Sequence, residues 1–168
     1  RLRFKNMGMH TVYTNTGDGY IRIEYCDFDS AAATFIFDYQ GHNNYFGHNT
    51  FTNVIGAVMG LTTTYPEKCI IGMERDTACV FEYNTLDNAA DGMFDSGALV
   101  EATFNHDDTV RYNRITNAGY GMYVAGNSYA IHHNSLSLVG GFGSERVGIQ
   151  IGSKGSGANE IFSNVLVG

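Results

Sequence analysis

The sequence lacks several features that would assign it to common protein classes. Lysine is scarce, tryptophan is absent and proline occurs once among 168 residues, while the net charge is −7 and the acidic residues are scattered. Because no basic patch exists to displace the counterions of a phosphate backbone, we expect no nucleic-acid partner. No apolar run approaches the roughly 18 residues that a membrane span needs, and the N-terminus has no signal-peptide pattern. We therefore expect neither a membrane span nor a targeting segment.

Helical periodicity is also missing. No segment keeps apolar residues at a spacing of about 3.6 through successive turns, whereas 21 Gly, 11 Tyr and 11 Phe are present. Aromatic residues favour strands, and glycine favours turns. Since 43% of the residues are apolar, the chain can supply a core. We expect a single all-β domain over residues 1–168.

The cysteines are odd in number, so Cys26, Cys69 and Cys79 cannot all pair within the chain. Cys26 is expected to be a small buried residue. Cys69 and Cys79 flank a predicted insertion and could close it with a disulfide. No cysteine spacing typical of a metal site occurs, so we predict no cofactor, and Ca²⁺ binding by loop acids is left open.

The chain contains one sequence motif twice. Residues 81–94 are FEYNTLDNAADGMF, and residues 110–123 are VRYNRITNAGYGMY. Each copy places apolar residues before and after a first Asn, then a second Asn, and then a Gly that leads into a short apolar run. Extending this register finds further copies at spacings of about 21 to 35 residues, which suit one turn of a solenoid. The position of the first Asn is occupied by Cys26, Asn49, Asn84, Asn113, Asn134 and Asn164.

This repeat predicts a right-handed parallel β-helix of about six or seven coils, with three strands in each coil. Strands of adjacent coils lie about 4.8 Å apart, so the Asn residues should stack into a ladder along the axis. Asn tolerates the left-handed backbone of a tight bend, and its amide can bond to neighbouring coils. The handedness follows the general preference of parallel crossovers. Neither end has a capping unit, which predicts an excerpt of a longer helix, or stacking contacts with a neighbouring chain.

The short run after the repeated Gly is expected to be a strand with its middle column outward. That column would form an apolar strip of Met59, Phe94 and Tyr123. Such a strip could bind a sugar ring. Alternatively, an insertion loop or another subunit covers the strip. The Tyr and His residues directly before the first Asn are expected to stack. Glu82 and Arg111 on adjacent coils are expected to form a surface salt bridge worth under about 1 kcal/mol.

Three insertions, near 61–78, 95–108 and 139–147, are expected to leave the coil after this strand and to wall one edge of the strip. They would line a groove with charged residues. These residues are Glu74, Arg75, Asp76, Asp95, Glu101, His106, Asp107, Asp108, Glu145 and Arg146. Asp95 stands in an otherwise apolar column. It either caps the turn through the amides of Ser96 and Gly97, or is a carboxyl group whose burial raises its pKa toward general-acid use.

Three segments, DSGAL (95–99), DTVRYNRI (108–115) and GMYV (121–124), carry a resemblance to a known group. They resemble a stretch of the parallel β-helix glycoside hydrolases of the pectate-lyase-like superfamily and of related secreted proteins. There the phrase is Asp-Gly-Gly-Ala-Ile-Tyr, then Thr-Val-Ile-Arg-Tyr-Asn-Arg-Ile, then Gly-Ile-Tyr. In this chain Ser96 replaces the first of those Gly residues, and Val100 replaces the Tyr.

The resemblance implies a hydrolase of polysaccharides or oligosaccharides, with Asp95 as one catalytic carboxylate. Carboxylates on adjacent coils would stand about 5 Å apart, as in retaining glycosidases. Carboxylates separated by two coils would stand about 9.5 Å apart, as in inverting glycosidases. Glu101 and Asp107 are the candidate partners. Sugar contacts are expected from Met59, Phe94, Tyr123, His106, Arg75 and Arg146.

Two other functions fit the same sequence. One is a structural or adhesive β-helix, such as a surface fibre or a tailspike stem. The other is a polysaccharide lyase, which needs a basic residue beside an acidic substrate. Arg75 and Arg146 are the strong bases of the predicted groove. The low Lys and high Gly, Asn, Thr and Tyr contents resemble those of secreted carbohydrate-handling proteins, so we expect a secreted or cell-surface location.

Overall fold

The computed structural model describes residues 1–7, 10–15, 17–31, 34–54, 71–89, 98–118, 120–138, 147–151 and 158–168. These residues form strands β1 to β19 and no helix, which confirms the all-β prediction. The described part of the chain accordingly has no helix able to cross a membrane.

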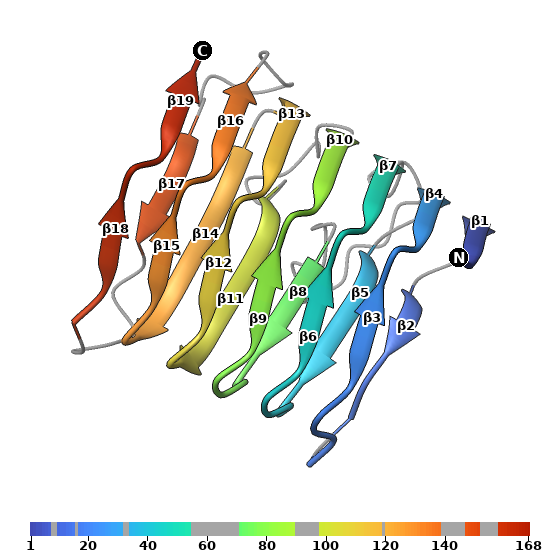
Figure 1. Cartoon of the computed structure of the whole chain (residues 1–168), viewed down its shortest axis with the longest axis horizontal. Helices are drawn as coiled ribbons and strands as arrows, with labels where there is room; N and C mark the ends of the chain where they lie inside the picture. Colours follow the sequence, from blue (N-terminus) through green and yellow to red (C-terminus); the bar gives the residue numbers. More distant parts are fainter. Residues whose placement is uncertain are drawn as a thin grey trace, which may run out of the picture.

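The strands belong to three parallel sheets, which we call A, B and C (Figure 1). Sheet A contains β1 (Arg3–Met7), β4 (Asp27–Ala31), β7 (Thr50–Val54), β10 (Thr85–Ala89), β13 (Arg114–Ala118), β16 (Ser135–Leu138) and β19 (Val165–Val167). Sheet B contains β2 (His10–Tyr13), β5 (Thr34–Tyr39), β8 (Ile71–Glu74), β11 (Ala98–His106), β14 (Tyr120–Asn127) and β17 (Val147–Ile151). Sheet C contains β3 (Arg22–Glu24), β6 (Tyr45–Gly47), β9 (Val80–Glu82), β12 (Thr109–Arg111), β15 (Ala130–His132) and β18 (Glu160–Phe162).

The chain visits the sheets in a fixed rotation. Each strand pairs in parallel with the strand three places earlier, so successive rounds lie side by side from the N-terminal to the C-terminal end (Figure 1). We call one passage through A, B and C a repeat. The passages between sheets are the A–B, B–C and C–A corners.

The core lies between the three sheets and is built from stacked columns. In sheet A the buried column consists of Phe28, Phe51, Leu86, Ile115 and Leu136. The Phe28 and Phe51 rings stack with centroids 4.7 Å apart, and Phe28 also meets Phe35 of sheet B at 5.6 Å. In sheet C the buried column is Phe46, Phe81, Val110 and Ile131. The hydrophobic residues on either side of each first Asn therefore supply the core, as the repeat predicts.

The Asn ladder is confirmed at the C–A corner. Each amide oxygen accepts the backbone N–H of the equivalent residue one repeat earlier, at 2.9 or 3.0 Å, in the pairs Cys26–Asn49, Asn49–Asn84, Asn84–Asn113, Asn113–Asn134 and Asn134–Asn164. Each amide nitrogen donates to a carbonyl of that earlier repeat, for example from Asn84 to Phe46 and from Asn113 to Phe81, both at 3.0 Å. These side chains thereby bind backbone groups at the corner between sheets C and A.

The left-handed backbone lies one residue earlier than predicted. The positive φ values, 53° to 56°, belong to the residues directly before the first Asn, namely Tyr25, His48, Tyr83, Tyr112, His133 and Ser163. The side chain of each ladder Asn points into the corner, and the residue directly before it adopts the left-handed conformation that turns the chain. For the second Asn the prediction holds at Asn53 and Asn117, whose φ values are 58° and 55°.

The sheet B strands of two repeats differ from the predicted ones. β8 begins at Ile71 and β11 at Ala98, so each follows a connecting segment, 55–70 or 90–97, instead of preceding it. The predicted insertions 61–78 and 95–108 thus each contain a strand of sheet B. The sequence Gly-Met-Phe at 92–94 resembles Gly-Met-Tyr at 121–123, which lies in β14, and this likeness predicted that the two would pair. β14 pairs with β11, whose nine residues offer a longer ladder of backbone hydrogen bonds.

Candidate functional site

The predicted groove residues fall partly inside and partly outside the described part of the chain. The connecting segments 55–70, 90–97 and 139–146 all link a strand of sheet A to a strand of sheet B, at the A–B corner. Asp95, Phe94, Met59 and Arg146 fall in these segments and lie outside the described residues. Arg75, His106 and Asp107 instead follow or end β8 and β11, at the B–C corner. Of these residues, the structure therefore places only Arg75, His106 and Asp107.

Asp107 cannot pair with Glu101 as a catalytic dyad. β11 carries the chain from Glu101 toward Asp107 at about 3.3 Å per residue, which separates their Cα atoms by on the order of 20 Å. Glycosidase carboxylates stand roughly 5 to 9.5 Å apart. Asp107 is an exposed corner residue with φ 61°, and its carboxylate lies 3.3 Å from His106 Nδ1. His106 Nε2 also lies 3.1 Å from Thr77 Oγ1 of the preceding repeat, so these residues act as corner contacts.

Arg75 is likewise engaged at the B–C corner. Its Nη1 donates to the Tyr39 hydroxyl at 3.1 Å, and its guanidinium carbon lies 5.8 Å from the Tyr39 ring centroid. Its φ of 62° places it in the left-handed region. These contacts join neighbouring repeats and hold the arginine at the B–C corner.

Glu101 lies in the middle of sheet B. In register it stands between Gly72 of β8 and Tyr123 of β14, and the same row continues to Phe37 and Gln150. The predicted strip placed Phe94 beside Tyr123, but Glu101 and Gln150 occupy the positions in register on either side of Tyr123. Met59 and Phe94 themselves lie outside the described residues. The sequence places a carboxylate, not a third apolar side chain, in this row.

Glu82 and Arg111 form a tighter contact than a surface pair. Arg111 Nε donates to Glu82 Oε2 at 2.5 Å, and the Tyr45 hydroxyl donates to Glu82 Oε1 at 3.0 Å. Glu82 is only 8% exposed, so the predicted surface salt bridge is wrong on this point. Desolvation, followed by the hydrogen bond to Glu82, raises the pKa of Tyr45 to about 12. Gly47 leaves room for this ring, since a Cβ there would meet the Tyr45 hydroxyl oxygen at 2.3 Å.

The residues before the first Asn form an exposed stack of rings, as expected. Tyr25, His48, Tyr83, Tyr112 and His133 stack with successive centroids 4.8 to 5.1 Å apart. Each ring covers the face of the next, so the stack presents ring edges, hydroxyl groups and imidazole nitrogens to solvent. Stacking of about 0.5 to 1.5 kcal/mol per pair offsets the cost of the left-handed backbone at these positions.

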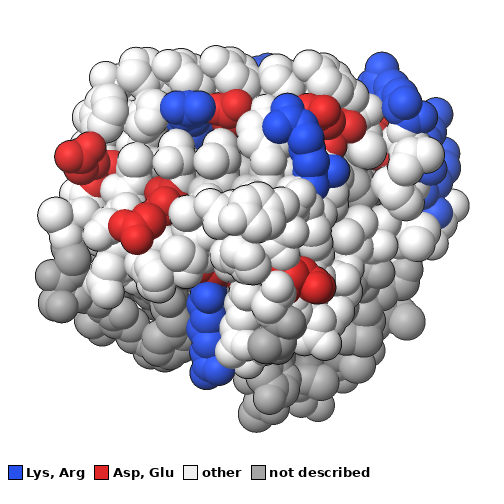
Figure 2. All heavy atoms as spheres, turned by 60° about the horizontal axis from the view of Figure 1, so that its bottom comes forward, with Lys and Arg blue, Asp and Glu red and all other residues white. Residues whose placement is uncertain are grey.

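Charged groups on the outside are largely mixed in sign. Figure 2 shows most basic side chains beside acidic ones on the face that it presents. Pairs such as Arg22–Glu24, at 2.7 Å, account for this pattern.

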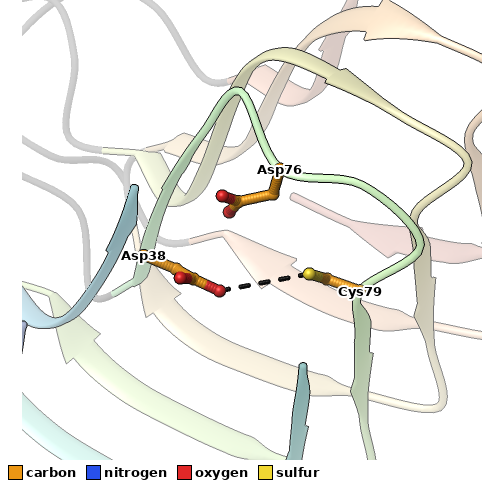
Figure 3. Close-up of side chains that lie close together, drawn as sticks. All are labelled: Asp38, Asp76 and Cys79. Carbon is orange, nitrogen blue, oxygen red and sulfur yellow. Dashed lines mark hydrogen bonds between the residues drawn. The ribbon is translucent and has the colours of Figure 1, made fainter. Parts of the chain in front are cut away.

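A buried polar cluster inside the B–C corner has the most unusual chemistry among the described residues. Asp38, at the end of β5, and Asp76 and Cys79, after β8, offer two carboxylate oxygens and a thiol sulfur within 4.8 Å of one another (Figure 3). Both aspartates are 0% exposed and Cys79 is 1% exposed. Cys79 is a free thiol, so the predicted disulfide with Cys69 does not form. Cys26 is also free and buried, as expected.

Hydrogen bonds fix the members of this cluster. Asp38 Oδ1 accepts from the Thr14 hydroxyl, and Asp38 Oδ2 accepts from Asn44 Nδ2 at 2.8 Å. Asp76 Oδ1 accepts the backbone N–H of Gly41 at 2.8 Å. The Cys79 sulfur lies 4.0 Å from Asp38 Oδ2, the contact drawn in Figure 3.

Burial dominates the acid–base behaviour of the cluster. Desolvation raises the pKa of Asp38, against the lowering effect of its bonds from Asn44 and Thr14. Desolvation also raises the pKa of the Cys79 thiol, and the nearby carboxylates of Asp108, Asp76 and Asp38 raise it further. A metal such as Zn²⁺ would use two carboxylates and the thiolate here, and its binding would have to displace the proton that burial holds on the thiol.

Sequence reasoning missed this cluster because its members come from different repeats outside the Asn column. The available signal was the position five residues before each first Asn, occupied by Asn44, Cys79, Asp108, Tyr129 and Asn159. Three of these form a second, interrupted ladder, in which Asn44, Asp108 and Asn159 accept the backbone N–H of Ile21, Cys79 and Tyr129.

Comparison with known proteins gives no relative for this chain. No family model, no curated protein and no solved structure matches it.

Proposed function

We propose that the chain is a stretch of a right-handed parallel β-helix that binds a polysaccharide or oligosaccharide and hydrolyses its glycosidic bonds outside the cell. The fixed rotation through three parallel sheets and the continuous Asn ladder support the helical architecture. Right-handedness follows from the strong preference of parallel crossovers.

The observation that carries the enzymatic proposal is the position of Glu101. It stands in register with Tyr123 on the adjacent strand, and Asp95 lies six residues before it in the sequence. Gly72, its neighbour on the other side, brings no side chain into the row. An acidic residue in register with an aromatic residue suits a sugar, because aromatic rings pack against the C–H faces of pyranoses.

The reaction would use Asp95 and Glu101 as the carboxyl pair. The protonated carboxyl gives its proton to the glycosidic oxygen as the bond to the anomeric carbon breaks. In an inverting reaction the other carboxylate takes a proton from water, whose oxygen then bonds to that carbon. In a retaining reaction it first forms a covalent glycosyl intermediate, which water hydrolyses.

A polysaccharide panel assayed with matched variants tests this proposal. Asp95→Asn and Glu101→Gln are each expected to lower activity by at least about a hundredfold, the usual contribution of a general acid or base. Asp107→Asn is the control, since its carboxylate lies beside His106 at the B–C corner and Asn tolerates its left-handed backbone. Full activity in both Asp95→Asn and Glu101→Gln would remove this pair from the mechanism.

The non-catalytic alternative is a structural or adhesive β-helix. The exposed ring stack from Tyr25 to His133 favours it, since an unbroken external ladder strengthens a fibre without any need for chemistry. Binding of a polysaccharide without turnover, unaffected by Glu101→Gln, would support this alternative. A polysaccharide lyase is the weaker candidate, because Arg75 is held at the B–C corner by Tyr39.

A further inference from the structure

Two adjacent histidines bring nitrogen atoms together at the C–A corner. His132 ends β15 and His133 follows it, and their Nδ1 atoms lie 2.8 Å apart. Side chains of successive residues in a strand normally point to opposite faces. The left-handed backbone of His133, with a φ of 56°, breaks this alternation at the corner. His133 is exposed and His132 is half-buried, so solvent reaches this pair of nitrogen donors.

The same two positions hold other residues in the other described C–A corners. The pairs there are Glu24–Tyr25, Gly47–His48, Glu82–Tyr83, Arg111–Tyr112 and Phe162–Ser163. Among these corners, the one at His132 and His133 supplies two imidazoles. His48 has the same φ of 56° and stands in the same ring stack, but its neighbour is Gly47. His48 is therefore a natural comparison with one imidazole.

Aromatic neighbours hold the planes of both imidazoles. His132 stacks on Phe162 with ring centroids 4.7 Å apart and an interplanar angle of 10°. His133 stacks on Tyr112 with centroids 5.1 Å apart and an angle of 30°. The two imidazole planes are nearly perpendicular to each other, at 86°. Because these contacts restrain the rings, the two Nδ1 atoms are positioned before any ligand arrives, which lowers the entropic cost of binding.

The distance between the two Nδ1 atoms suits a particular coordination geometry. Two ligands at right angles, each about 2.0 Å from a metal ion, lie about 2.8 Å apart, whereas tetrahedral ligands at that bond length lie about 3.3 Å apart. Square-planar or tetragonal sites of nitrogen and oxygen ligands are typical of Cu²⁺ and Ni²⁺, and a given set of ligands binds Cu²⁺ more tightly than Ni²⁺ or Zn²⁺. The observed 2.8 Å therefore favours Cu²⁺ over tetrahedral Zn²⁺.

The charges around the pair are balanced. Arg111 is the neighbour of His132 in register on β12, but its Nε donates to Glu82 Oε2 at 2.5 Å. The negative charge of Glu160 acts on His132 in the opposite direction to Arg111. The nearest arginine is thus paired with an acid and opposed by another, so it does not keep a cation away from the corner.

We propose that His132 and His133 form a binding site for a divalent copper ion on the outside of the C–A corner, with the two Nδ1 atoms as adjacent ligands and water completing the coordination. In the metal-free protein one Nδ1 donates its proton to the other in a hydrogen bond. In the metal-bound protein each neutral ring carries its proton on Nε2, so both Nδ1 lone pairs bind the ion. The proton moves through solvent between two nitrogens of one ring, and nothing is oxidised or reduced.

Calorimetric titration with Cu²⁺, on protein without an added histidine tag, tests the site. The wild type is expected to bind one ion per chain. His132→Gln and His133→Asn each remove one ligand, and Asn tolerates the left-handed backbone of the second position. Each variant should bind Cu²⁺ about a hundredfold or more weakly, because a second linked ligand binds at a high effective concentration. His48→Gln is the control and should bind like the wild type.

Electron paramagnetic resonance of the copper complex gives a second measurement. The spectrum should show coupling to two nitrogen nuclei in the wild type and to one in each of the two variants. Thermal unfolding without metal checks that the variants are folded. The proposal would be overturned if the wild type bound no stoichiometric ion, if either variant lost less affinity than stated, or if His48→Gln lost as much.

The buried cluster of the B–C corner is the competing location for a metal ion. Cys79→Ser removes the sulfur of that cluster and should leave Cu²⁺ binding unchanged, since Cys79 is buried and belongs to another corner. Binding that is lost in Cys79→Ser but retained in His132→Gln and His133→Asn would place the ion in the buried cluster, against the proposal.

Discussion

The side chains of Asn84 and Asn113 bind one another across adjacent repeats. Asn84 Nδ2 donates to Asn113 Oδ1 at 3.1 Å, and the same oxygen accepts the Asn84 backbone N–H at 2.9 Å. Both residues are 1% exposed. One buried oxygen therefore serves two donors, and loss of the Asn113 side chain leaves the Asn84 N–H and the Phe81 carbonyl of the preceding repeat without this partner.

Replacing Asn113 with Ala is expected to lower the free energy of unfolding by about 3 kcal/mol or more, because each buried polar group left unpaired costs about 1 to 3 kcal/mol. Urea unfolding measures the loss. Asn117→Gly is the control, since glycine accepts the φ of 55° and loses one exposed hydrogen bond, to Asp87. A loss at Asn113 no larger than at Asn117 would contradict a structural role for the ladder.

Glu82→Gln is expected to destabilise the protein by about 1.5 to 3 kcal/mol, because it weakens the charged hydrogen bonds to Arg111 and Tyr45. The pKa of Tyr45 should fall from about 12 as the negative charge is removed, although desolvation keeps it above the ordinary value. Thermal unfolding and an NMR titration of Tyr45 measure the two effects. Glu24→Gln, whose partner Arg22 is largely exposed, should cost under about 1 kcal/mol.

Gly121→Ala is expected to destabilise by about 3 kcal/mol, since the new Cβ would lie 2.2 Å from the Gly148 carbonyl oxygen and 2.5 Å from Leu136 Cδ2. A backbone atom in a paired strand cannot move aside cheaply. Gly47→Ala meets instead the outer end of the Tyr45 ring, which can rotate, so about 1 kcal/mol is expected. Chemical unfolding compares the two variants, and the reverse order would be inconsistent with this packing.

His132 and His133 share one hydrogen bond between their Nδ1 atoms, 2.8 Å apart, so only one of these atoms can carry a proton. Burial, then the charges of His133 and Arg111, lower the pKa of His132. The unfolded chain therefore binds the proton more readily, and this pair costs stability as the pH falls through about 6.5. His133→Gln is expected to raise the pKa of His132 and to reduce the acid sensitivity of unfolding.

An NMR titration of the His132 ring measures that shift. His48→Gln is the matched control, because His48 stacks in the same column between Tyr25 and Tyr83 without touching His132. An unchanged pKa of His132 in His133→Gln would show that the neighbouring imidazole has no influence on it.

The sequence was sufficient to predict the all-β class and the ladder, because stacking forces the same residue type to recur at one position. Asn49, Asn84 and Asn113 could be aligned by inspection for this reason. The left-handed residue could not be assigned, since Tyr83 and Tyr112 have no special preference for positive φ. Their conformation is imposed by the Asn that follows.

The sheet B strands were harder to predict, because a short apolar segment does not identify its own partner. Met93 and Met122 look equivalent in sequence, but Met122 pairs with Val100 of β11. The buried acids were missed for a related reason. Asp38 and Asp76 look like ordinary loop residues, and only the return of the chain one repeat later brings them together.

Variation in length is concentrated at the A–B corner. β7 and β8 are joined there by residues 55–70, whereas β13 and β14 are joined by residue 119 alone, while the same register of strands continues on both sides. The framework thus tolerates new sequence at this corner without a change in how its layers stack. Foreign peptides grafted between Ala118 and Tyr120 should accordingly leave the stacking of the strands intact, which makes this corner a practical position for engineering recognition into the scaffold.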